Sequence, residues 1–206
     1  MSAPGRLFPA APRYSPLIGM LIGAVGGGVY WLGTQIWPAS IAVVLAMLAS
    51  ASLAARSNGE PASVSSALGP TSVLCILLNY AALMALSPAK LPFALPPNVA
   101  LGIIMIAGHA VSRALVVSVL ASPTHSSARS ASLGDLGIAL ALGIAPAALI
   151  GIPGLVGLAA AIAARILYIA WIARSRQSFS PVELDMTRRS TETCFYLGAL
   201  AAWAYI

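Results

Sequence analysis

Charged residues are scarce in this 206-residue chain: they make up 8% of it, whereas hydrophobic residues make up 59%. The mean hydropathy is accordingly high, at +0.91. This composition excludes an ordinary soluble domain, in which about a quarter of the residues are charged. It also leaves little sequence for a large domain outside a membrane. We therefore expect a single transmembrane domain over residues 1–206.

Residues that bind metals or form disulfides are also few. The sequence has two histidines and two cysteines, Cys75 and Cys194, and both cysteines fall inside apolar runs. They are expected to be small core residues rather than a disulfide or a metal pair. No segment has the spacing of a zinc site, a Walker loop or a catalytic serine motif. The net charge of +6 comes from scattered basic residues, which favours membrane topology and lipid headgroups over nucleic acid as its explanation.

Long apolar runs dominate the sequence instead. A bilayer core about 30 Å thick needs about 20 apolar residues per helix. The fold class is predicted to be all-α, a polytopic integral membrane helical bundle with about seven transmembrane helices. The expected spans are residues 16–36, 39–55, 71–86, 98–121, 133–150, 153–173 and 191–206. In the first span Gly19, Gly23 and Gly27 recur every fourth residue, so a neighbouring backbone can approach closely, within this chain or from another subunit.

The connecting segments alternate between arginine-bearing and nearly charge-free, and this alternation predicts the topology. With a cytosolic N-terminus, the opposite side carries only Lys90, whereas eight arginines are cytosolic. These eight are Arg6, Arg13, Arg56, Arg129, Arg174, Arg176, Arg188 and Arg189. The split follows the positive-inside rule, and Trp31 and Trp37 suit the far interface. We expect a multi-pass protein of the bacterial inner membrane, with membrane lipid as a partner and a polar site facing the cytosol.

Two arginines lie within the predicted spans, where each costs at least about 2.5–3.5 kcal/mol unless it reaches water or a partner. Arg113 and Arg165 both sit about two turns before the cytosolic end of their helices. Either they snorkel toward the headgroups, or they face a cytosol-open cavity and bind an anion, since guanidinium suits phosphate oxygens. His109 lies one turn from Arg113 on the same helix face. It is either a packed residue or part of that site.

Only five carboxylates occur, and the predicted topology places all of them at the cytosolic side. They are Glu60, Asp135, Glu183, Asp185 and Glu192. Asp135 precedes a span, which favours a helix N-cap, and Glu192 at the start of the last span favours the helix dipole. Glu183 and Asp185 are expected to be solvated loop charges. The adjacent Arg188 and Arg189 are either topology determinants or ligand contacts.

Five segments in a fixed order resemble the cobalamin synthase family. Y-S-P-L-I-G-M-L-I-G-A-V-G-G-G-V-Y-W looks like that family's first helix, which reads F-P-L-V-G-x-x-x-G, and A-L-G-P-T-S-V-L-C-I-L-L resembles its R-I-G-x-x-G-x-L helix. G-H-A-V-S-R (108–113) resembles the fourth-helix segment that ends in arginine. L-G-D-L and T-E-T-C-F-Y-L-G-A-L-A follow in the family's order. The likeness covers most of the chain.

The sequence departs from the family pattern in three polar motifs. Family members carry an acidic H-x-D-G-L-A-D-T-A-D-G segment, expected to hold Mg²⁺, where this chain has only A-A-R-S-N-G-E-P-A-S-V-S-S. The family's K-D-S-R-I-G is V-S-S-A-L-G here, and its G-D-x-L-G-A is P-V-E-L-D-M. By position, Arg113, Asp135 and Glu192 remain.

The resemblance implies a transferase of cobalamin (vitamin B12) biosynthesis, an adenosylcobinamide-GDP ribazoletransferase. Such an enzyme joins α-ribazole, or its 5′-phosphate, to adenosylcobinamide-GDP and releases GMP, with Mg²⁺ as cofactor. It implies a corrinoid nucleotide substrate, with other corrinoid-assembly proteins as further partners. The implied roles are diphosphate binding by Arg113 and Arg165, nucleotide binding by Arg188 and Arg189, metal binding and catalysis by Asp135 and Glu192, and proton acceptance by His109.

Two other functions fit parts of the sequence. A membrane scaffold or assembly subunit without catalytic activity would explain why helices and glycine faces remain while three polar motifs are lost. A small transporter would use the intramembrane Arg113, Arg165 and Asn79, but polar residues that gather toward one face do not mark a path through the midplane.

Overall fold

The computed structural model describes residues 12–58, 70–87, 96–121, 131–175 and 181–205. Over these residues the chain is helical and contains no strand, which confirms the predicted all-α class. The elements are η1 (Pro12–Tyr14), α1 (Ser15–Gly33), α2 (Ala39–Asn58), α4 (Pro70–Leu86), α5 (Pro97–Leu120), α6 (Leu133–Leu149), α7 (Ile152–Ser175) and α8 (Pro181–Trp203). Outside the described residues lie Arg6, Glu60, Lys90, Arg129 and Arg176.

Four described helices are long and apolar enough to cross a membrane. They are Pro12–Gly33, Ala39–Ser57, Pro97–Leu120 and Ile152–Ile172. Two more apolar helices, α4 and α6, have 17 residues each. At 1.5 Å per residue such a helix is about 25 Å long, a little short of the bilayer core. The predicted helical membrane bundle is therefore confirmed.

Apolar and polar side chains are distributed in the opposite way to a soluble protein. Large apolar side chains such as Leu48, Leu77 and Leu167 point outward and are 59–70% exposed. His109, Arg113 and several hydroxyl residues are instead buried among the helices. Because lipid solvates an outer leucine well and a charge badly, this distribution suits a hydrocarbon surrounding.

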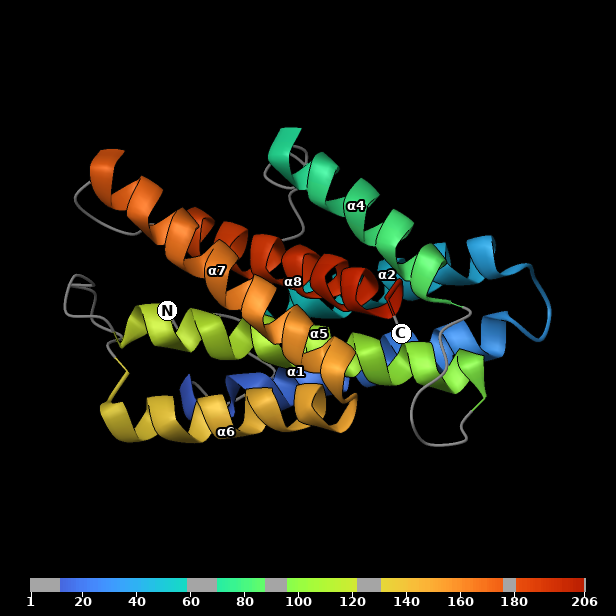
Figure 1. Cartoon of the computed structure of the whole chain (residues 1–206), viewed down its shortest axis with the longest axis horizontal. Coiled ribbons are helices and arrows are strands. Elements are labelled where there is room, and N and C mark those ends of the chain that lie inside the picture. The colour runs from blue at the N-terminus through green and yellow to red at the C-terminus, as the bar shows by residue number, and fades with distance from the viewer. Residues whose placement is uncertain (1–11, 59–69, 88–95, 122–130, 176–180, 206) are drawn as a thin grey trace, which may run out of the picture.

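Helix α5 occupies the centre of the bundle and packs against α1, α6, α7 and α8 (Figure 1). Its closest neighbour is α1, whose glycine face predicted from the sequence contacts α5 within the same chain. A Cβ atom on Gly23 would lie 2.5 Å from Ile106 Cα, and one on Gly27 would lie 2.6 Å from Gly102 Cα. The missing side chains thus let the two backbones touch, which brings the polar residues of α5 into the interior.

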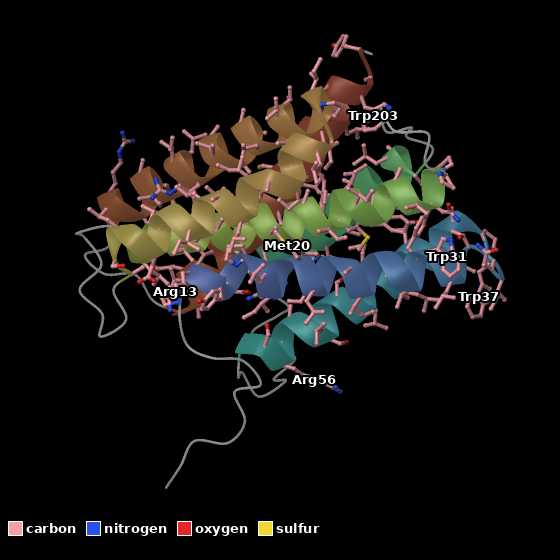
Figure 2. The ribbon with its side chains drawn as sticks, turned by 90° about the horizontal axis from the view of Figure 1, so that it is seen from below. Arg13, Met20, Trp31, Trp37, Arg56 and Trp203 are labelled. Atoms are coloured by element: carbon pink, nitrogen blue, oxygen red, sulfur yellow. The ribbon has the colours of Figure 1, made fainter. Side chains whose placement is uncertain are left out.

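The relative direction of α1 and α5 determines which of their residues share an end of the bundle. Helices α1 and α5 run antiparallel, since Gly19 meets His109 and Gly27 meets Gly102. Figure 2 shows Arg13 toward one end of the bundle and Trp31 and Trp37 toward the other. This arrangement agrees with the predicted alternation of spans and with an aromatic belt at the far interface. Which end is cytosolic stays a prediction.

The connection between α6 and α7 is a tight turn. Gly151 has φ 82°, a left-handed conformation that side chains rarely adopt, and its N–H donates to the Ala148 carbonyl over 3.0 Å. This is the usual way for a helix to end in glycine. The two apolar helices can therefore follow each other directly, as the adjacent predicted spans 133–150 and 153–173 require.

The last helix begins much earlier than the sequence analysis predicted. The seventh span was expected from residue 191, with a loop before it, but α8 begins at Pro181. Proline suits the first turn of a helix, and Glu183 in that turn favours the positive end of its dipole. The prediction of solvated loop charges at Glu183 and Asp185 was therefore wrong: both lie on a helix, and Glu183 is only 8% exposed.

Candidate functional site

The candidate site begins with a buried pair between α5 and α8. His109 on α5 and Glu192 on α8 approach within 3.2 Å, from Nδ1 to Oε2, and their side chains are 7% and 10% exposed. Glu192 was expected to open the last span, but it lies in the middle of α8. It therefore pairs with histidine rather than with the start of a helix. A carboxylate on Nδ1 favours the tautomer in which Nε2 accepts a proton.

Arg113 lies one turn beyond His109 on α5 and is 6% exposed. Its Nη2 donates to Ser57 Oγ at the end of α2 over 2.9 Å. The side chain thus faces the bundle interior, which favours the predicted anion-binding role over snorkelling. Guanidinium has five N–H donors, so one bond to a hydroxyl leaves others for a ligand.

Asp185 joins two further arginines at the start of α8. Its Oδ1 accepts from Arg188 Nη2 at 2.6 Å and its Oδ2 accepts from Arg189 Nε at 2.6 Å. The spacing of three and four residues places all three side chains on one helix face. Burial alone would raise the pKa of Asp185, but the positive charge of Arg188 and the hydrogen bonds from both arginines hold that pKa below its ordinary value.

These groups form one electrostatic unit, here called the charge cluster: His109, Arg113, Asp185, Arg188, Arg189 and Glu192. The Arg113 guanidinium interacts electrostatically with Arg188, Glu192 and Asp185. The Glu192 carboxylate interacts in the same way with His109, Arg188 and Arg113. Three guanidinium groups face two carboxylates, so these six groups carry excess positive charge even when His109 is neutral. The chemistry that this arrangement suits is anion binding with a histidine beside the anion.

A tyrosine missing from the sequence analysis lies beside the His109–Glu192 pair. The Tyr196 ring packs against Gly108, where a Cβ atom would lie 2.5 Å from the ring carbon Cε1. Its buried hydroxyl feels the charge of Glu192, but makes no hydrogen bond of good geometry within the described structure. The G-H pair at 108–109 and the four-residue step from Glu192 to Tyr196 were the available signals.

Asp135 has a different role from the N-cap that the sequence analysis favoured. Ser132 is the N-cap of α6, and Asp135 is the third residue of a capping box. The Ser132 hydroxyl accepts from the Asp135 backbone N–H at 3.0 Å, and Asp135 Oδ2 accepts from the Ser132 backbone N–H at 3.2 Å. The S-L-G-D spacing is a known signature of this motif. The charge that Asp135 feels is that of Arg13, not one of the charge cluster.

Arg165 also lies apart from the cluster. Its Nη2 donates to the backbone carbonyl of Ser118 at 3.1 Å, near the end of α5. Loss of hydration on burial is the main electrostatic effect on its guanidinium, and no residue of the charge cluster contributes to it. Of the predicted site residues, the structure thus brings together His109, Arg113, Arg188, Arg189 and Glu192, and leaves Arg165 and Asp135 outside.

The role of Asp185 in the cluster leads to a pH-dependent prediction. Because its folded-state pKa is lowered, its stabilising contribution is complete above the unfolded pKa of about 4 and is lost as pH falls through the folded value. Asp185→Asn should therefore melt lower than the parent at pH 7, with the difference shrinking below about pH 4. Thermal unfolding of the detergent-purified protein from pH 3 to pH 8 measures this. A difference that stays constant with pH would contradict it.

The fold and the charge cluster define a class: a polytopic helical membrane protein with ionised side chains buried together toward one end. A comparison with curated proteins finds a relative, an adenosylcobinamide-GDP ribazoletransferase from Leptothrix cholodnii. The two are 29% identical over 231 residues, which cover 93% of this chain and 85% of the relative. The aligned region is longer than the 206-residue chain, so it includes stretches of the relative without a counterpart here. No family model and no solved structure matches the chain.

Proposed function

We propose that this protein is a divergent member of the cobalamin synthase family and acts in cobalamin biosynthesis as an adenosylcobinamide-GDP ribazoletransferase. The observation that carries the proposal is the similarity to a curated protein of that name over 93% of the chain. It agrees with the ordered motifs found in the sequence. The proposed location is the bacterial inner membrane, with the charge cluster facing the cytosol.

The charge cluster would hold the diphosphate of the activated corrinoid. Phosphoryl transfer depends mostly on positioning and on neutralising charge on the phosphate oxygens. Arg113 is held by Ser57, and Arg188 and Arg189 are held by Asp185, so their guanidinium groups are oriented before substrate arrives. Preoriented donors stabilise a transition state better than mobile ones. Arg165 is not needed for this role.

His109 would act as the proton acceptor. Its Nδ1 is occupied by Glu192, which leaves Nε2 as the basic nitrogen. A hydroxyl of α-ribazole that attacks the cobinamide-linked phosphorus must lose a proton, which His109 can accept. The bond from that phosphorus to the bridging oxygen breaks, and GMP leaves with that oxygen. Glu192 would stabilise the resulting imidazolium. Tyr196, which closes the same region, would help to keep water out.

The described residues do not form the Mg²⁺ site that the resemblance implies. Among them no group of three or more His, Cys, Asp or Glu side chains is placed to hold a metal ion. Asp185 already accepts from two arginines, Glu192 pairs with His109, and Asp135 belongs to the capping box of α6. We therefore derive no step through a metal. A requirement for Mg²⁺, with Asp135 and Glu192 as ligands, stays a prediction from the resemblance.

The proposal is tested by genetic complementation. In a strain without its own synthase, supplied with cobinamide and the lower-ligand base, the chain should restore B12-dependent growth. Arg113→Gln should lower the rate of ribazole transfer at least about 10²-fold, as expected when one oriented hydrogen-bond donor is lost, and should therefore restore growth poorly. Arg56→Gln, which changes an exposed arginine on α2 outside the cluster, is the matched control and should complement fully.

Membrane abundance of every variant must be equal for this comparison to count. Absence of growth with the well-expressed parent chain would overturn the proposed activity. The assembly-subunit alternative, favoured by the missing acidic segment, predicts that same absence together with co-purification of other corrinoid-assembly proteins. Turnover by the purified chain alone would exclude that alternative.

A further inference from the structure

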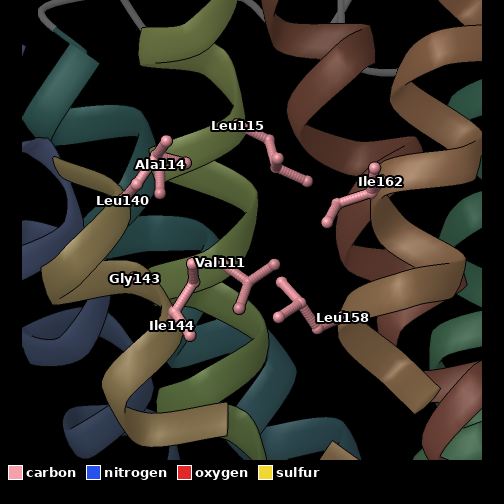
Figure 3. A pocket seen from close by; sticks show the side chains of 8 residues that line it. All are labelled: Val111, Ala114, Leu115, Leu140, Gly143, Ile144, Leu158 and Ile162. Carbon is pink, nitrogen blue, oxygen red and sulfur yellow. The ribbon is translucent and has the colours of Figure 1, made fainter. Parts of the chain in front are cut away.

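A narrow apolar crevice lies between α5, α6 and α7 on the outer face of the bundle (Figure 3). It is lined on α5 by Val111 and Leu115, on α7 by Leu158 and Ile162, and on α6 by Ile144 among others. Ile144 and Ile162 stand at its rim, 37% and 38% exposed. The cavity volume is about 20 Å³, too little to enclose a ligand. An extended hydrocarbon chain could instead lie along it, with its outer side against the surrounding lipid.

A positive charge stands at the polar end of this crevice. Arg165 follows Ile162 by one turn of α7, and Ser118 follows Leu115 by one turn of α5. Arg165 Nη2 donates to the Ser118 carbonyl at 3.1 Å, and Ser118 lies within the last turn of α5. Such carbonyls have no partner inside their own helix, so the arginine caps α5 and stands where the helix reaches the membrane interface.

The bond to Ser118 leaves other hydrogen-bond donors of the Arg165 guanidinium without an acceptor in the described structure. Arg165 Nε is buried and has no hydrogen-bond partner in the described structure. Three of the four described carboxylates are engaged elsewhere, Asp185 and Glu192 within the charge cluster and Asp135 with Ser132. Burial, and no charge of a neighbouring described residue, acts on the half-buried Arg165 guanidinium. An anionic ligand at its exposed side would therefore stabilise it.

We propose that this crevice binds one anionic phospholipid, with an acyl chain along Val111, Leu115, Leu158 and Ile162 and the phosphate on Arg165. The apolar lining and the arginine follow each other along the same helix faces, in the order in which a lipid presents its chain and its phosphate. A guanidinium pairs with phosphate more strongly than an ammonium does, because it offers several N–H groups in one plane.

The test is the thermal midpoint of the purified chain in a neutral detergent, with added dioleoyl phosphatidylglycerol or dioleoyl phosphatidylcholine. Phosphatidylglycerol should raise the midpoint of the parent by about 5 °C more than phosphatidylcholine does, as for a ligand well above its dissociation constant. Arg165→Gln should lose this increment. Arg56→Gln, which removes an exposed arginine on α2, should keep it and so controls for the general attraction of a basic protein to anionic lipid.

A second variant separates lipid binding from the capping role of Arg165. Ile144→Phe fills the crevice from its rim and leaves Arg165 unchanged, so it should reduce the increment while the midpoint without lipid is preserved. Inorganic phosphate should give no increment, because it lacks the chain. The proposal is overturned if Arg165→Gln responds like the parent, or if phosphate alone has the effect of the lipid. Neither result depends on transferase activity.

Discussion

Gly23→Leu is expected to lower the thermal stability of the chain in detergent strongly. Any Cβ atom at this position would lie 2.5 Å from Ile106 Cα, which belongs to the backbone of α5 and cannot rotate away. The two helices would have to separate along their whole contact, which includes Gly19 and Gly27. Overpacking in a core costs typically 1–3 kcal/mol, and more where a backbone must move. The thermal midpoint should fall by about 10 °C or more, since 1 kcal/mol corresponds to about 2–4 °C at this size.

Gly28→Leu is the matched control, because no atom lies within 4 Å of a Cβ atom at Gly28 and this residue is exposed. The same side chain is thus added to the same helix, five residues along, on the face that points outward. It should leave the midpoint nearly unchanged. Equal losses in both variants would mean that glycine acts through helix flexibility rather than through close contact with α5. The measurement is thermal unfolding of both purified variants beside the parent.

The sequence predicted the helical structure of α1 and α5 and the glycine face of α1, because a lipid surrounding restricts the structures that an apolar run can form. An apolar run must be helical to satisfy its backbone, and a glycine every fourth residue must form one face. Which helix meets that face was beyond the sequence, since Gly102 on α5 is a single glycine among apolar residues. The contact between Gly27 and Gly102 depends on how all the helices pack.

Helix α8 shows where hydropathy misleads. Its first ten residues, from Pro181 to Ser190, contain four charged side chains, so the segment was predicted to be a loop. Local signals pointed the other way: Pro181 and Glu183 suit a helix start, and Asp185 stands three and four residues before Arg188 and Arg189. That spacing places the charges on one helix face, where they pair with each other. The charges thus reflect a buried polar face rather than exposure to water.

The candidate site was partly predictable. An arginine within a span needs a polar partner, which drew attention to Arg113 and Arg165 equally. Only the fold separates them: Arg113 faces Ser57 in the interior, whereas Arg165 caps the end of α5. The pairing of His109 with Glu192 joins residues more than eighty positions apart, and no local pattern reveals such a contact.

The side of the membrane on which the charge cluster lies determines whether cytosolic nucleotides can reach it. Cysteine labelling at the two ends of the bundle can measure this directly. Leu133, at the start of α6, is 82% exposed near the polar end, and Ile36, after α1, is 71% exposed near the tryptophan end. Neither is charged, so replacing them by cysteine keeps the arginine distribution that determines orientation. Replacing Cys75 and Cys194 by alanine first removes the native thiols.

Each single-cysteine variant is then treated with a membrane-impermeant maleimide, in intact cells and after permeabilisation. Cysteine at position 36 should react in intact cells, whereas cysteine at position 133 should react only after the membrane is opened. Cytosolic nucleotides could then reach Arg113, Arg188 and Arg189. The reverse pattern, with position 133 labelled from outside and position 36 protected, would place the charge cluster away from the cytosol and contradict both the topology and the proposed substrate.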